Sequence, residues 1–234
     1  MCSSRLPGKV LMPLGGEPVL KHVIGRARAA GVFDTVVVAT TIQAIDDELA
    51  RAATGWDARV IRGDEDDVLS RYGLAARATG ADVIVRVTAD CPLLDPDVVG
   101  AMVRRFAEGG ADLVTNARLR TFPRGLDAEV FSRAALEAAL AEADRSHQRE
   151  HVTPFLYEHP ERFRIADFTG AADNSRLRWT LDTAQDYDLL QRIFAAAPDP
   201  AGLRYEGVLE ILAAHPDWSA INAGVEQKKV GEQA

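Results

Sequence analysis

Cysteine is scarce in this chain of 234 residues, which contains two, Cys2 and Cys91. Two cysteines cannot build a disulfide framework, and such sparse usage is typical of a reducing cytoplasm. Long hydrophobic runs are lacking as well, and Pro7 and Pro13 interrupt the N-terminal stretch where a signal peptide would need its apolar region. We therefore expect a cytoplasmic protein without a membrane partner.

Positive charge is not in surplus either, because 27 Lys and Arg face 35 Asp and Glu, which gives a net charge of -8. A broad basic surface for nucleic acid is therefore not expected. An anionic small substrate is still compatible with this balance, since local cations and a bound metal ion decide its binding. The length, with 47% hydrophobic residues, fits one large α/β domain.

Strand-like and helical segments alternate along the chain. Apolar spacing predicts two helices near the C-terminus and others over 17–31, 43–53, 65–80, 95–110, 132–143 and, disturbed by Pro154, 147–160. Runs of β-branched and apolar residues predict strands over 35–40, 58–62, 82–90, 111–116, 163–168 and 177–182. This alternation predicts an α/β fold with a doubly wound, mostly parallel sheet.

The organisation that we expect is one domain over residues 1–225, followed by a polar tail over 226–234. The pattern is less regular in about 118–160, where we expect a small inserted lobe of mixed or antiparallel character.

The N-terminal stretch MCSSRLPGKVLMPLGG has the character of a phosphate loop. Arg5 and Lys9 supply positive charge, and backbone N–H groups around Gly8 can face phosphate oxygens. Such a loop ordinarily follows a strand and opens a helix. Taken alone, the residues RLPGK are equally compatible with an ordinary basic tail.

Two aspartates, Asp90 and Asp182, end two of the predicted strands. Ligands of an open parallel sheet bind beyond the carboxyl ends of its strands, so two carboxylates there would form an oxygen-rich site for Mg²⁺. Either aspartate alone is as readily a turn or capping residue, and Thr183 with Asp186 has the pattern of a capping box. The pair, together with the phosphate-type loop, favours the metal site.

Six motifs, in this order along the chain, together resemble the cytidylyltransferase family: SSRLPGKVLMPLGGEPVLKHVIGRARAAG, RGDEDDVLSRY, VRVTADCPLLDP, TFPRGLDAEVF, REHVTPFLY and LRWTLDTAQDYDL. The resemblance covers nearly the whole chain. The family includes acylneuraminate and 3-deoxy-manno-octulosonate cytidylyltransferases, and this chain is most similar to the spore coat polysaccharide biosynthesis protein F type.

The resemblance implies a fold of the nucleotide-diphospho-sugar transferase type and transfer of CMP from CTP to a sugar, with release of pyrophosphate. It implies Mg²⁺ as the cofactor, and dimerisation, common in the family, would make 118–160 the interface. At matching positions, the residues implied to bind the nucleotide are Ser4, Arg5, Gly8 and Lys9. Those implied to take part in catalysis are Lys9, Asp90 and Asp182, with the two aspartates as the metal ligands.

Candidates for binding the sugar come from three of these motifs. Asp67 and Arg71 are one helical turn apart, and alternation puts Asp127 and Glu129 on the same side of an extended segment. For each of these residues a surface ion pair or structural contact is as good an interpretation as substrate contact.

The remaining sugar candidates are Arg124, Arg149 and His151, to which the same two interpretations apply. Arginine binds carboxylate through two parallel hydrogen bonds, so Arg124 and Arg149 would suit an acidic sugar.

The chain departs from the family at its start, because the family's first strand has no counterpart here. That strand is central in the sheet, so we expect unpaired edges on its two neighbours. A start codon assigned too late would explain the difference; a true truncation would leave an inactive homologue that acts as a binding protein. We hypothesise that activity is impaired, and equal CTP turnover by an N-terminally extended version would refute this.

Two other enzyme classes compete with this interpretation. His147, Glu150 and His151 match the H-x-x-E-H motif of inverted zinc peptidases, which is short enough to arise by chance. A glycosyltransferase that uses a nucleotide sugar would keep the fold and the Mg²⁺ but would not release pyrophosphate.

Overall fold

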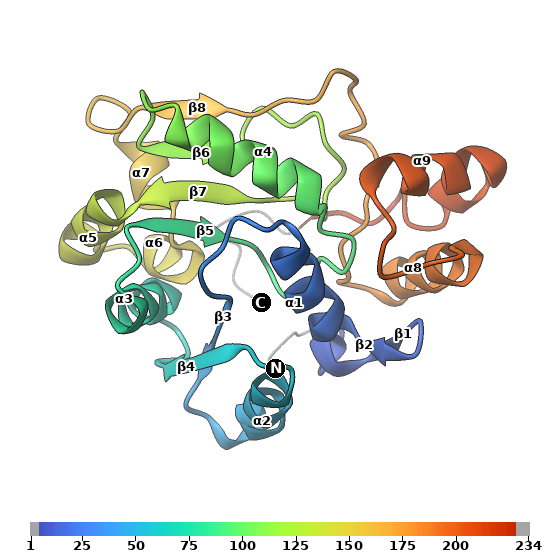
Figure 1. The fold of residues 1–234 in the computed structure, drawn as a ribbon, viewed down its shortest axis with the longest axis horizontal. Coiled ribbons are helices and arrows are strands. Elements are labelled where there is room, and N and C mark those ends of the chain that lie inside the picture. Colours follow the sequence, from blue (N-terminus) through green and yellow to red (C-terminus); the bar gives the residue numbers. More distant parts are fainter. Residues whose placement is uncertain (1–4, 228–234) are drawn as a thin grey trace.

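Strands and helices alternate along residues 5–227, the part of the chain that the computed structural model describes (Figure 1). The helices are α1 (Val19–Ala29), α2 (Asp47–Gly55), α3 (Val68–Thr79), α4 (Pro96–Ala107), α5 (Arg133–Glu142), α6 (Ser146–His151), α7 (Pro154–Glu158), α8 (Ala184–Ala196) and α9 (Tyr205–Ala214). The strands are β1 (Pro13–Leu14), β2 (Glu17–Pro18), β3 (Val37–Thr41), β4 (Arg59–Gly63), β5 (Val83–Arg86), β6 (Leu113–Thr115), β7 (Glu129–Ser132) and β8 (Ile165–Asp167). Helices α1 to α5 overlap the segments predicted for them.

The strands between residues 5 and 227 form three sheets. β1 and β2 make an antiparallel hairpin, β3 and β4 are parallel, and the third sheet has the order β5-β7-β6-β8. Within it β6 and β8 are parallel, whereas β7 is antiparallel to both of its neighbours. Among the strands of the described residues, β3 pairs only with β4 and β5 only with β7.

The four-stranded sheet carries helices on both faces. Val114 and Val130 pack with residues of α1 and α4, while Leu113 and Phe131 pack with residues of α3 and α5. Neighbouring residues of a strand point to opposite faces, so β6 and β7 are buried on both sides. The apolar runs in the sequence reflect this double burial.

Two predicted strands are corrected by the structure. The strand expected over 82–90 ends at Arg86, because Arg86 lies opposite Glu129, the first residue of β7, and the ladder has no partner beyond it. The segment 177–182 is not a strand: Arg178 forms an isolated bridge with Arg124, and the N–H of Leu181 donates to the carbonyl of Asp90. This segment pairs with two different loops in turn, so no continuous ladder forms.

The segment 118–160 contributes β7 to the sheet and places α5, α6 and α7 beside it (Figure 1). The antiparallel character expected of this segment is therefore found in β7. The disturbance predicted at Pro154 is also present, since α6 ends at His151 and α7 begins at Pro154, with Val152 between them at φ 74°.

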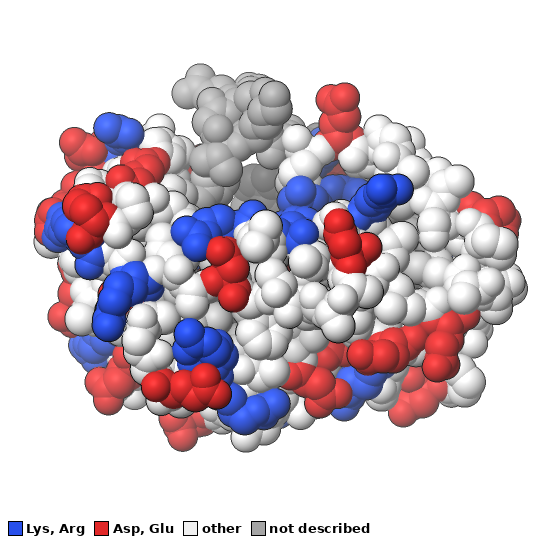
Figure 2. All heavy atoms as spheres, turned by 90° about the horizontal axis from the view of Figure 1, so that it is seen from above, with Lys and Arg blue, Asp and Glu red and all other residues white. Residues whose placement is uncertain are grey.

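Charged side chains of both signs are interspersed on the face shown in Figure 2. None of the helices between residues 5 and 227 is long and apolar enough to cross a membrane.

Candidate active site

The phosphate-type loop brings Lys9 to the carboxylates of both predicted metal ligands. Gly8 has a φ of 71°, a left-handed conformation that favours glycine, and Lys9 begins a short 3-10 helix directly after it. From there Lys9 Nζ donates to Asp90 Oδ2 at 2.6 Å and to Asp182 Oδ1 at 2.7 Å. Lys9 is 81 positions from Asp90 and 173 from Asp182 in the sequence, and the structure brings the three side chains together as predicted.

The two segments that carry the aspartates are joined by their backbones. The carbonyl of Asp90 accepts from the N–H of Leu181 at 2.8 Å and from the hydroxyl of Thr180 at 3.3 Å. Cys91, directly after Asp90, is buried, and burial first and then the nearby Asp90 charge raise the pKa of its thiol. Cys91 is therefore a neutral packing residue and not a thiolate nucleophile.

Arg178 holds Asp182 in place from the side opposite to Lys9. Its guanidinium donates to Asp182 Oδ2 at 2.7 Å and to Asp186 Oδ1 at 2.8 Å. Asp186 is fully buried and forms the predicted capping box with Thr183 at the start of α8. Arg178 was not among the predicted site residues. Its position four residues before Asp182 and eight before Asp186 is the signal that could have found it.

Arg5 completes a group of six charged residues. Its Nη2 lies 3.0 Å from Asp182 Oδ2, and its Nη1 donates to the carbonyl of Glu226 at 3.3 Å. We name this group the charged cluster: Arg5, Lys9, Asp90, Arg178, Asp182 and Asp186. Ser4, the remaining predicted nucleotide contact, lies outside the described residues.

The charge states of Lys9 and Asp182 are fixed by each other. Burial acts to lower the pKa of the Lys9 ammonium, but Asp90 and Asp182 outweigh it and raise that pKa above its ordinary value. Burial likewise acts to raise the pKa of the Asp182 carboxyl, but Lys9, Arg178 and Arg5 together hold that pKa below its ordinary value. Lys9 is therefore a cation and Asp182 an anion at neutral pH.

The donor set of the charged cluster fits a hard divalent cation that brings further ligands of its own. Between residues 5 and 227 no group of three or more His, Cys, Asp or Glu side chains is arranged to hold a metal ion. Mg²⁺ needs no such cage, because it is commonly held by one or two carboxylates with substrate phosphates and water. The Lys9 ammonium already lies between Asp90 and Asp182 as an internal cation, which shows that this position accepts positive charge.

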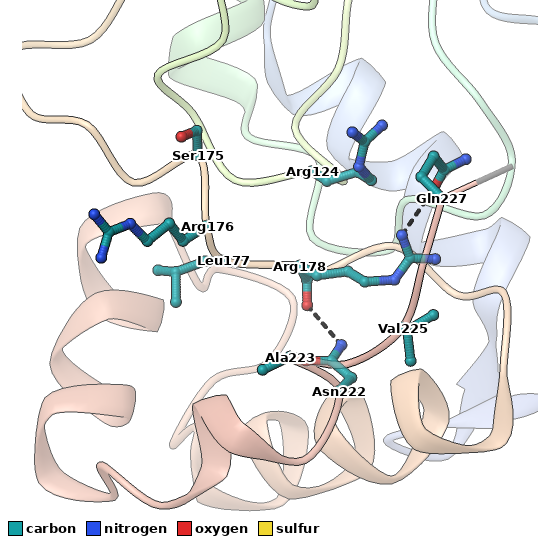
Figure 3. Close-up of a pocket in the computed structure, with 9 residues that line it drawn as sticks. All are labelled: Arg124, Ser175, Arg176, Leu177, Arg178, Asn222, Ala223, Val225 and Gln227. Carbon is teal, nitrogen blue, oxygen red and sulfur yellow. Dashed lines mark hydrogen bonds between the residues drawn. The ribbon is translucent and has the colours of Figure 1, made fainter. Parts of the chain in front are cut away.

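A hollow of about 170 Å³ lies beside the charged cluster (Figure 3). Its wall includes Arg124, Arg176 and Arg178, and the C-terminal segment crosses it, where Gln227 accepts from Arg178 at 2.7 Å. Its volume is below that of common ligand pockets and suits an anionic group rather than a whole nucleotide. Gly125, at φ 112°, lets the Arg124 loop pack closely against the backbone of Trp179, because a Cβ at this position would lie 2.6 Å from that backbone.

The sugar candidates at the start of α3, Asp67 and Arg71, have partners within the protein. Asp67 caps the start of α3 by accepting from the N–H of Ser70, and it also pairs with Arg149, whose Nε lies 3.0 Å away. Arg71 is buried and donates to two backbone carbonyls, one of them that of Ala39 at 3.3 Å. Asp67 therefore pairs with Arg149, whereas the Arg71 side chain donates to the backbone carbonyls of Ala39 and Glu65.

Asp127 and Glu129 likewise have separate partners. Asp127 pairs with Arg120, whereas Glu129 is buried. The groups that donate to the Glu129 carboxylate are Arg86 at 2.8 Å, Tyr157 at 2.6 Å and the Thr153 hydroxyl at 2.9 Å. His151 is half-buried, and this burial, more than the nearby charges, lowers its pKa. Their roles toward a sugar stay predictions.

The competing zinc motif has no metal geometry in the described residues. His147 Nε2 lies 2.5 Å from Glu158 Oε1, so the imidazole is already hydrogen-bonded to a carboxylate of the next helix, α7. Within residues 5–227, no three His, Cys, Asp or Glu side chains are arranged to hold a metal ion, and this includes those of α6.

Comparisons with known proteins agree with the resemblance seen in the sequence. A family model described as cytidylyltransferase matches residues 1–219. An uncharacterized protein of Methanocaldococcus jannaschii, MJ1063, is 33% identical over 98% of this chain and 94% of its own length. The spore coat polysaccharide biosynthesis protein SpsF of Bacillus subtilis is 31% identical over 93% of this chain and 92% of its own length.

The solved structure of a cytidylyltransferase from Leptospira borgpetersenii superposes with a TM-score of 0.89 at 31% identity, over 97% of this chain and 94% of that one. The expected fold of the nucleotide-diphospho-sugar transferase type is thereby confirmed. The chain belongs to the cytidylyltransferase family.

Proposed function

We propose that this chain is a Mg²⁺-dependent nucleotidyltransferase that transfers CMP from CTP to a sugar and releases pyrophosphate. The observation that carries the proposal is the bridging of Asp90 and Asp182 by Lys9, in a chain of the cytidylyltransferase family. This contact brings together the cations and carboxylates that we propose for a metal–triphosphate site. Free CTP is a cytoplasmic metabolite, so the proposal keeps the expected cytoplasmic location.

The proposed reaction asks the protein for positioning and charge rather than covalent chemistry. A sugar hydroxyl attacks the α-phosphorus in line and loses its proton to water. The bond from that phosphorus to the β-phosphate oxygen breaks, and pyrophosphate leaves with the electron pair. Lys9 and Arg5 bind phosphate oxygens. Asp90 and Asp182 would hold Mg²⁺, which would neutralise charge on the phosphates when bound.

The sugar that we propose is acidic or otherwise modified and belongs to a cell-surface polysaccharide. SpsF, a relative of this chain, is named for spore coat polysaccharide biosynthesis. Arg124 lines the hollow beside the charged cluster and forms no ion pair with residues 5–227, whereas Arg149 is paired with Asp67. We therefore favour Arg124 over Arg149 as the partner of a sugar carboxylate. A homodimer through 118–160 is also part of the proposal.

The test is product analysis with CTP, Mg²⁺ and a panel of neutral and acidic sugars. We expect pyrophosphate and a CMP-sugar in equal amounts, identified by mass spectrometry, with an acidic sugar preferred. Release of a nucleoside diphosphate from a nucleotide sugar, without pyrophosphate, would contradict the proposal and identify a glycosyltransferase. Light scattering of the purified protein tests the dimer.

A further inference from the structure

The Lys9 ammonium occupies the position that a divalent cation would need. It lies 2.6 Å from one Asp90 oxygen and 2.7 Å from one Asp182 oxygen, and its side chain is 13% exposed. A metal ion that bridges the same two oxygens would lie about 2.0–2.1 Å from each. The ammonium and the metal ion therefore cannot bind this pair of oxygens at the same time.

We propose that Lys9 is an internal cation that fills the metal position of the free protein, and that it exchanges with the metal ion when the metal–nucleotide complex binds. The inference rests on the proposed function, because a triphosphate gives the displaced ammonium new oxygens to bind. Lysine suits such an exchange, since its charge is compact and its four-carbon stem is flexible.

The rest of the charged cluster is arranged so that it can stay in place during this exchange. Arg178 binds Asp182 Oδ2, the oxygen that Lys9 leaves free, and is anchored at its other nitrogen by the buried Asp186. Asp182 therefore keeps its orientation when Lys9 departs. Without any cation between them, Asp90 and Asp182 would repel each other in a partly buried site, which explains why the free protein needs the ammonium there.

Arg5 provides a matched comparison for Lys9. It carries the same charge and also contacts Asp182, at 3.0 Å, but on Oδ2 and not between the two carboxylates. Removing Arg5 takes one positive charge from the site and leaves the bridging position filled. Removing Lys9 takes the same charge and opens the position.

The experiment is a titration of the protein with Mn²⁺ in the absence of nucleotide, followed by the electron paramagnetic resonance signal of free Mn²⁺. If Lys9 bridges the carboxylates in nine molecules of ten, vacating the position tightens the apparent affinity about tenfold. We expect weak binding by the unchanged protein, binding at least about tenfold tighter by Lys9→Met, and a change of less than about threefold in Arg5→Met. The double variant Lys9→Met with Asp90→Asn should lose the gain.

Three results would overturn the exchange: tight Mn²⁺ binding by the unchanged protein, no gain in Lys9→Met, or an equal gain in Arg5→Met, which would indicate a general charge effect. Circular dichroism checks that each variant is folded. If Lys9→Met is unfolded, Lys9→Gln takes its place. Tight Mn²⁺ binding by the unchanged protein overturns the exchange whichever variant is used. CMP-sugar formation is scored separately. If the unchanged protein forms CMP-sugar but its Lys9 variants bind Mn²⁺ no more tightly, only the exchange is contradicted. If the Lys9 variants bind Mn²⁺ more tightly but the unchanged protein does not turn over CTP, only the proposed function is contradicted.

Discussion

The charged cluster and the middle segment 118–160 use their charges in different ways. In the cluster, three cations share three carboxylates, the residues come from three parts of the chain (5–9, 90 and 178–186), and Lys9 and Arg178 each bind two of the carboxylates. In the middle segment the two acidic candidates have separate partners, since Asp127 pairs with Arg120 and Glu129 with Arg86. Shared charges can be redistributed when a ligand arrives, whereas a dedicated pair must first be broken. The cluster therefore has the character of a binding site, and the pairs have the character of supports.

The largest effect is expected from Arg178→Met, which leaves the buried Asp186 without its cation. The Arg178 side chain is 7% exposed and that of Asp186 is 0% exposed. Removing one partner of such a pair costs about 3–5 kcal/mol of stability. The control is Lys21→Met, which breaks an exposed pair with Glu17 and should cost less than about 1 kcal/mol. Urea unfolding measures both, and equal losses would erase the contrast between buried and exposed pairs.

Asp90→Asn should lower CTP turnover by about 100-fold or more, because a preorganised charge at the reacting phosphate is lost. Asp127→Asn sharpens the comparison, since Asp127 is paired with Arg120 outside the cluster. We expect a smaller effect there, confined to the KM for the sugar. Steady-state pyrophosphate release measures both variants. A loss in Asp127→Asn as large as that in Asp90→Asn would show that the two regions do not differ as described.

Tyr157→Phe should cost about 1–3 kcal/mol, because it removes one donor from the buried carboxylate of Glu129. Burial, followed by the charge of Glu129, raises the pKa of Tyr157 above its ordinary value, so the hydroxyl stays protonated and donates at all working pH values. Urea unfolding gives the stability, and thermal stabilisation by CTP should stay as in the unchanged protein. Loss of that stabilisation would place Tyr157 in the nucleotide site.

The smallest effect expected is the acid dependence of Asp182. Its pKa is lowered in the folded protein, so its contribution to stability is present above the unfolded value of about 3.9 and is lost as the pH falls through the folded value. The stability difference between the unchanged protein and Asp182→Asn should therefore shrink below about pH 4. Urea unfolding at pH 7, 5, 4 and 3 measures it. If the difference in free energy of unfolding between the two proteins grew as the pH fell, the pKa of Asp182 would be raised rather than lowered by folding, which contradicts the account.

The sequence predicted most of what depends on local pattern. The helices followed from apolar spacing, and the break at Pro154 followed from proline chemistry. Strand lengths were less predictable, because β5 ends where its partner β7 begins and not where its own residues lose β-propensity. The segment 177–182 has the residues of a strand but is placed between two loops, which only tertiary structure decides.

The site shows the same division. Arg5, Lys9, Asp90 and Asp182 were expected to meet because the two aspartates were predicted to end strands at one edge of a sheet. They do meet, but for another reason: β5 ends at Arg86 and 177–182 is not a strand, and the N–H of Leu181 donates to the carbonyl of Asp90. Arg178 was missed, although its spacing from Asp182 and Asp186 was a signal for it, because only the tertiary structure shows that its side chain turns back to the start of α8. The partners of Asp67 and Asp127 were also out of reach, because they depend on which side chains neighbour them in space.

The most direct test of the central claim is thermal stabilisation of the protein by each of the four nucleoside triphosphates with Mg²⁺, for the unchanged chain and for Asp90→Asn. A ligand that binds the native state must raise the apparent stability. The account predicts a rise in Tm with CTP above the other three, dependent on Mg²⁺ and lost in Asp90→Asn. No rise with any triphosphate, or an equal rise in both proteins, would contradict the assignment of the charged cluster as a metal–CTP site.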